Sequence, residues 1–127
     1  MADGQKFKIL IVDDDAFILN MYVAKFTKEG HVVDTARNAS EVLTKLKEQA
    51  LPDVVLLDVV LPGTDGLELL AQIRKENIAP TTRFIMLTNQ GAGEEVEKAK
   101  ALGVVGYVVK ADLTPSEVVA KVLSALQ

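Results

Sequence analysis

The apolar residues of this chain gather in short runs that alternate with longer amphipathic stretches. In the central run, Val54 to Leu61, apolar residues crowd both sides of a single carboxylate, Asp58. A short run that is apolar on both faces is typical of a buried strand in a parallel sheet, and Pro62-Gly63 then ends it. We expect strands at residues 8–12, 31–36, 54–61, 82–88 and 104–110.

The stretches between these runs carry apolar residues at helical spacing. Two of them open on the spacing of a capping box, Asn38 to Glu41 and Thr114 to Glu117. The expected helices begin near Asp14 or Asp15, Asn38, Thr64 or Asp65, Glu94 and Thr114. Alternating strands and helices predict an α/β fold, a doubly wound five-stranded parallel sheet with five helices on both faces.

Composition narrows the class of protein. The chain has 127 residues, and we expect a single domain over 1–127 with a flexible N-terminal segment at 1–6. The formal net charge of -4 leaves no basic face for direct nucleic-acid binding, and the lack of cysteine excludes disulfides and thiol chemistry. The polar start is unlike a signal peptide and no apolar run has membrane-spanning length. We therefore expect a protein of the cytoplasm that does not insert into membranes.

Polar side chains follow the ends of the apolar runs: Asp13-Asp14, Asp58, Thr88 and Lys110. In a doubly wound sheet these ends meet at one edge, where ligands bind. Two carboxylates with a backbone carbonyl suit a small hard cation such as Mg²⁺, whereas a lysine with a hydroxyl suits a phosphoryl group. A carboxylate can also attack phosphorus to form an acyl phosphate. Taken singly, each residue has a plainer interpretation as a helix cap or a strand-end side chain.

Four stretches matter together. They are Ile9-Leu10-Ile11-Val12-Asp13-Asp14-Asp15, Leu57-Asp58-Val59-Val60-Leu61-Pro62-Gly63-Thr64-Asp65-Gly66, Met86-Leu87-Thr88 and Gly106-Tyr107-Val108-Val109-Lys110. In this order they resemble the receiver domain of two-component response regulators, of the stand-alone CheY-like type. The resemblance covers nearly the whole chain and implies a CheY- or flavodoxin-like sheet with strand order 2-1-3-4-5.

The resemblance implies a role for each residue of the site. Asp58 would be the phosphoacceptor and Lys110 would pair with the phosphoryl oxygens. Asp14 would bind Mg²⁺ directly, Asp13 would act mainly through water, and the backbone carbonyl of Val60 would complete the protein ligands.

The resemblance also implies a switch. Thr88 would swing its hydroxyl toward the phosphoryl group and Tyr107 would turn inward behind it. This movement would alter the surface formed by the fourth helix, the fifth strand and the fifth helix, where a downstream protein would bind.

The chain departs from the family pattern near the site. Ala111 follows Lys110 where the family usually has proline after a cis bond; a cis bond before alanine costs about 2.5–4 kcal/mol, so we expect a trans bond and a different loop. Asn89 stands where a small residue is common and would crowd access to an acyl phosphate. Val60 and Gln90 flank the site, and we expect them to affect the lifetime of the phosphoryl group.

The leading hypothesis is a signalling switch of a phosphorelay, phosphorylated by a sensor histidine kinase or a phosphotransfer protein and existing as a monomer or a phosphorylation-linked dimer. The alternative is a pseudo-receiver that binds proteins without phosphorylation. An independent phosphatase is disfavoured, because Val60 occupies the position where a phosphatase of the dehalogenase type has its second aspartate. We expect no enzyme activity beyond the domain's own phosphotransfer and dephosphorylation. His31 is expected to be an exposed residue at the entry to a strand.

Overall fold

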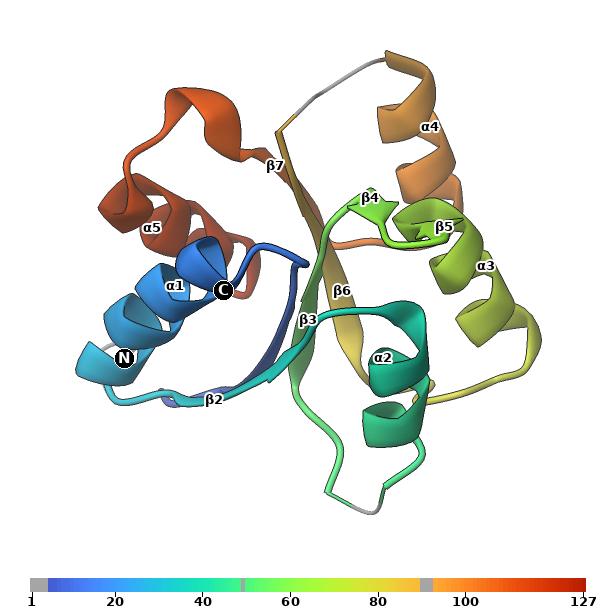
Figure 1. Cartoon of the computed structure of the whole chain (residues 1–127), viewed down its shortest axis with the longest axis horizontal. Coiled ribbons are helices and arrows are strands. Elements are labelled where there is room, and N and C mark those ends of the chain that lie inside the picture. The colour runs from blue at the N-terminus through green and yellow to red at the C-terminus, as the bar shows by residue number, and fades with distance from the viewer. Residues whose placement is uncertain (1–4, 49, 90–92) are drawn as a thin grey trace.

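The computed structural model describes residues 5–48, 50–89 and 93–127. Within these residues a parallel sheet forms in the order β2-β1-β3-β6-β7 (Figure 1). The strands are β1 (Lys8–Val12), β2 (Val32–Ala36), β3 (Val54–Leu57), β6 (Arg83–Thr88) and β7 (Gly106–Val109). Since β6 and β7 are the fourth and fifth of these strands in the chain, the expected order 2-1-3-4-5 is confirmed.

Helices cover both faces of this sheet, as the alternating pattern predicted. They are α1 (Ala16–Lys28), α2 (Ala39–Leu46), α3 (Gly66–Lys75), α4 (Gly93–Ala101) and α5 (Pro115–Ala125). Figure 1 shows α1 and α5 on one side of the sheet and α2, α3 and α4 on the other. Among the described residues, no helix combines the length and the apolar character needed to cross a membrane.

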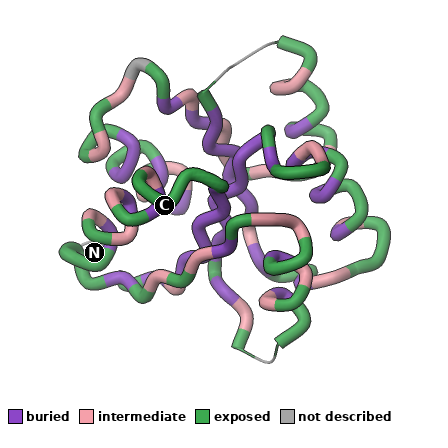
Figure 2. The backbone as a smooth tube through the Cα atoms, in the orientation of Figure 1, coloured by how far each residue is buried: buried purple, intermediate pink, exposed green. Residues whose placement is uncertain are grey.

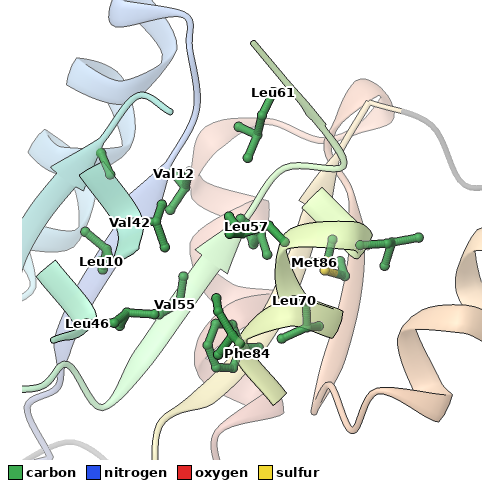
Figure 3. Close-up of a cluster of buried hydrophobic side chains, with 14 of the residues drawn as sticks. Leu10, Val12, Val42, Leu46, Val55, Leu57, Leu61, Leu70, Phe84 and Met86 are labelled. Carbon is green, nitrogen blue, oxygen red and sulfur yellow. The ribbon is translucent and has the colours of Figure 1, made fainter. Parts of the chain in front are cut away.

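The strands form the most deeply buried part of the molecule (Figure 2). Alternate residues of each strand pack on opposite faces. Leu10, Val55 and Phe84 join the cluster under α2 and α3 (Figure 3), whereas Ile9 and Leu56 join the cluster under α1 and α5. Burial on both faces explains why β1, β3 and β6 are largely apolar runs, because each such side chain contributes about 1.5–3 kcal/mol.

The helix caps agree with the sequence prediction in most details. Asp15 caps α1 and Asp65 caps α3 through their carboxylates, and Thr114 with Glu117 forms the full capping box of α5. At α2, the Asn38 side chain accepts a hydrogen bond from the backbone N–H of Glu41.

The largest differences from the expected element boundaries lie at β3 and β7. The central strand β3 ends at Leu57, and residues 60–65 form a short antiparallel pair, β4 (Val60–Leu61) and β5 (Thr64–Asp65). Strand β7 begins at Gly106 rather than at residue 104, and Lys110 opens a 3₁₀ turn, Lys110–Asp112. Each difference lies at a strand end, where turn geometry and not apolar character decides the boundary.

The expectation that His31 is exposed is wrong. Its side chain is only 6% exposed, and its Nδ1 accepts a hydrogen bond of 3.0 Å from the backbone N–H of Phe7. The ring stacks on Phe7 and meets Phe26 edge-on. Burial, followed by the nearby charge of Lys6, lowers the pKa of His31 below its usual value, so the fold holds this histidine in its neutral form.

Candidate functional site

Strand register brings the predicted carboxylates together. Val12 of β1 is paired with Leu57 of β3, so Asp13 and Asp58, one residue further along, leave neighbouring strands at the same level. The pairing of Thr88 with Val109 places Lys110 just beyond Thr88. Because all four strands are parallel, these residues share one edge of the sheet.

Lys110 lies between the two aspartates. Its ammonium nitrogen is 2.5 Å from Oδ2 of Asp13 and 3.4 Å from Oδ2 of Asp58. The side chains of all three residues are more than nine-tenths buried. Burial alone would lower the pKa of Lys110, but the hydrogen bond with Asp13 and the charge of Asp58 outweigh it and raise the pKa. The lysine is therefore a permanent cation, and in this state it is closer to Asp13 than to Asp58.

Among the carboxylates of the site, Asp58 is the one whose surroundings best suit it to react. Burial raises its pKa, and the charge of Lys110 and a hydrogen bond from the backbone N–H of Val60 offset this only in part. The Val60 N–H lies 3.2 Å from Oδ1, while Lys110 approaches Oδ2. A buried carboxylate with one neighbouring cation can attack an electrophile once further positive charge reduces the repulsion.

The backbone around Asp58 is held by Gly66, a residue to which no role was assigned from the sequence. The N–H of Gly66 donates to the carbonyl oxygen of Val59. A Cβ atom at Gly66 would lie 2.0 Å from the carbonyl oxygen of Asp58, so only glycine fits there. The turn between β3 and α3 therefore depends on a close backbone approach, for which the Asp65-Gly66 pair at a helix start was the available signal.

The neighbouring aspartates have different surroundings. Asp14 is exposed, and its backbone carbonyl accepts a hydrogen bond of 3.0 Å from Arg37. Asp15 is occupied as the N-cap of α1, which agrees with the plainer interpretation of that residue. Arg37 was not singled out from the sequence, because nothing in the pattern shows that it reaches across from the end of β2.

A cleft of about 270 Å³ connects these side chains to the surface. Its lining includes the expected residues Asp13, Asp14, Asp58, Val60, Thr88 and Lys110, together with Asn89. It also includes Glu95 of α4, a residue that the sequence pattern does not single out. Gln90, expected to flank the site, lies outside the described residues. The peptide bond before Ala111 is trans, as expected.

Tyr107 lies half-buried on β7, which β6 separates from the strand that Asp58 follows. Burial raises the pKa of its hydroxyl, and the negative charges of Glu95 and Asp58 raise it further. The phenol is therefore neutral and lies within the electric field of the site. The switch role of Tyr107 stays a prediction.

The donor set suits a magnesium ion, although it does not form a closed cage. Within the described residues, no three acidic or histidine side chains are grouped closely enough to enclose a metal. Mg²⁺ does not require such a cage, since it is usually bound through one or two carboxylates and retains several waters. Asp13, Asp14 and Asp58 offer hard oxygen donors along the same cleft. Asp13, Asp14 and Asp58 therefore fit Mg²⁺, and the ion would compete with Lys110 for the carboxylate of Asp13.

Comparisons with known proteins identify the family of the chain. The family model described as the response regulator receiver domain matches residues 9–123. The transcriptional regulatory protein ResD of Bacillus subtilis is 38% identical over all of this chain, which spans 51% of ResD. The chemotaxis protein CheY of Halobacterium salinarum is 32% identical over 93% of this chain and 98% of its own length.

A solved structure shows the same fold. The CheY-like receiver domain protein of Methanospirillum hungatei superposes with a TM-score of 0.83 at 30% identity, covering 96% of this chain and 94% of that one. The chain spans about half or less of the first curated relatives that it matches. What is shared with those longer proteins is therefore one domain.

Proposed function

The chain belongs to the family of response regulator receiver domains, and on that premise we propose that it is a phosphorylation-switched signalling domain whose phosphoacceptor is Asp58. One observation carries the proposal. Asp58 and Lys110 meet at the same end of the parallel sheet, at the base of an open cleft lined by further carboxylates. A nucleophile, a cation and metal donors are then within reach of one phosphoryl group.

The proposed reaction is a direct displacement on phosphorus. A carboxylate oxygen of Asp58 forms the new bond to phosphorus while the bond to the donor's leaving group breaks, and the leaving group departs with the electron pair. Lys110 would turn from Asp13 toward the phosphoryl oxygens. Bound Mg²⁺, held by Asp13, Asp14, Asp58 and the Val60 carbonyl, would supply the charge that allows two anions to approach.

The signal would then pass to the surface by a local change. We propose that the hydroxyl of Thr88 moves toward the phosphoryl group and that Tyr107 follows inward, which changes the face made by α4, β7 and α5. The upstream partner would be a sensor histidine kinase or a phosphotransfer protein, and the downstream partner a protein bound at that face. The proposed setting is the cytoplasm, with the domain as a monomer or as a dimer formed on phosphorylation.

The test is the intact mass of the chain after incubation with acetyl phosphate and Mg²⁺. We expect the addition of one phosphoryl group, its loss when the metal is chelated, and no addition to the variant Asp58→Asn. The same addition to Asp58→Asn would place the phosphoacceptor elsewhere. If the unmodified chain gains no mass and shows no spectral change with beryllofluoride, the pseudo-receiver hypothesis replaces the proposal.

A further inference from the structure

The cleft above Asp58 has an unequal charge distribution. Five carboxylates line it, those of Asp13, Asp14, Asp15, Asp58 and Glu95. Among the described residues that line it, the one cationic side chain is Lys110, and this lysine is already paired with Asp13. Any phosphoryl donor that enters the cleft is itself an anion and must approach this excess of negative charge.

Four of these carboxylates have a partner or a use. Asp13 and Asp58 contact Lys110, Asp15 accepts hydrogen bonds from the start of α1, and Asp14 belongs to the proposed metal donors. Glu95 is different, since none of the ion pairs found within the described residues includes it. It belongs to α4, on the opposite side of the sheet from α1.

Helix α4 places Glu95 beside the cleft. The residue is partly buried in the first turn of α4. It lines both the cleft and the groove between α3 and α4, together with Asp65, Glu68 and Lys98 in that groove. The negative charge of Glu95 also contributes to the raised pKa of Tyr107 on β7. The carboxylate therefore stands at the boundary of the site and contributes negative charge there.

We propose that Glu95 is a specificity-determining residue that selects among small phosphoryl donors by their net charge and disfavours dianions. The inference rests on the proposed function of Asp58. The charge of Glu95 acts on the donor as it enters, because Glu95 lines the same cleft and, among the described residues, has no ion pair that offsets its charge. A dianionic donor meets about twice the repulsion that a monoanionic donor meets.

The test compares two donors that differ in charge. Acetyl phosphate is a dianion at neutral pH and releases acetate when the P–O bond breaks, whereas phosphoramidate is a monoanion and releases ammonia when the P–N bond breaks. The rate constant of phosphorylation is measured with each donor by intact mass, with Mg²⁺ present, for the unmodified chain, Glu95→Gln and Glu94→Gln. Glu94 is the matched control, because it is exposed in the same helical turn and does not line the cleft.

At low salt, Glu95→Gln is expected to raise the rate constant about fivefold with acetyl phosphate and about twofold with phosphoramidate. The ratio of the two rate constants thus rises about twofold. At about 1 M salt, where the screening length is about 3 Å, most of this difference disappears. Glu94→Gln should leave the ratio close to that of the unmodified chain.

The outcomes separate the two levels of the proposal. If the unmodified chain accepts phosphoryl groups but Glu95→Gln leaves the donor ratio unchanged, or if Glu94→Gln changes it equally, Glu95 has no selective role and the function of Asp58 still stands. If neither donor phosphorylates the original chain or either variant, the proposed function itself is overturned.

Discussion

Lys110 and the two aspartates beside it show how single residues define this site. A buried carboxylate is costly unless a cation is close, and here one cation serves two carboxylates at 2.5 and 3.4 Å. The raised pKa of Asp58 shows that this compensation is incomplete. The site therefore keeps an excess of negative charge, which favours the binding of a divalent cation.

His31 provides a test at the same scale, far from the site. Its pKa in the folded chain lies below the usual value, so the unfolded chain binds more protons between the two pKa values. The free energy of unfolding should be highest above the unfolded pKa of about 6.5 and should fall as the pH drops through the folded pKa. Urea titrations from about pH 8 to about pH 5 would measure this slope.

The matched variant is His31→Asn, whose amide oxygen can accept the Phe7 N–H but whose side chain does not titrate. We expect it to be less stable than the unmodified chain at the upper end of the range and to have a flatter dependence on pH. An equally steep slope in this variant would mean that other groups cause the pH dependence.

At the scale of elements, local sequence signals and the structure agree closely. The caps Asp15, Asp65 and Thr114 each begin a helix where the sequence predicts one. Caps are readable because they satisfy backbone groups within three residues of themselves. The short pair β4 and β5 was not predicted, since two-residue strands carry no periodic pattern.

The capping box of α5 can be tested directly. Thr114→Ala removes the hydrogen bond to the backbone N–H of Glu117 and should lower the free energy of unfolding by about 0.5–2 kcal/mol. Ser124→Ala, an exposed position later in the same helix, should change it by about 0.5 kcal/mol or less. Chemical denaturation of both variants measures the difference, and equal losses would argue against the box as the cause.

The whole molecule places one polar edge on an otherwise apolar sheet. The central strands β1, β3 and β6 are buried on both faces, by α1 and α5 on one side and by α2, α3 and α4 on the other. Their carboxyl ends are left open, which is where the cleft lies. The core thus holds the strand register rigid, while the edge keeps charged groups that can respond to a ligand.

Metal binding should consequently stabilise the whole fold. With Mg²⁺ at about ten times its dissociation constant, we expect the free energy of unfolding to rise by about 1.4 kcal/mol. The variant Asp14→Asn, which lacks the proposed direct ligand, should lose most of this gain and keep its stability in the metal-free state. Thermal unfolding with and without a chelator measures both, and an equal gain in the variant would exclude Asp14 as a ligand.

The sequence by itself determined the alternation of strands and helices, most helix caps and the chemical types at the strand ends, because these depend on periodicity and on contacts within a few residues. It indicated Asp58, Asp13 and Lys110 as a group through the rule that parallel strands end at one edge and through the resemblance of their motifs to those of receiver domains. Tertiary structure decided the rest. It set the strand register that pairs Lys110 with Asp13, the burial of His31 between Phe7 and Phe26, the backbone approach at Gly66 and the place of Glu95 in the cleft. Each of these depends on groups far apart in the chain, and no local pattern records which of them meet.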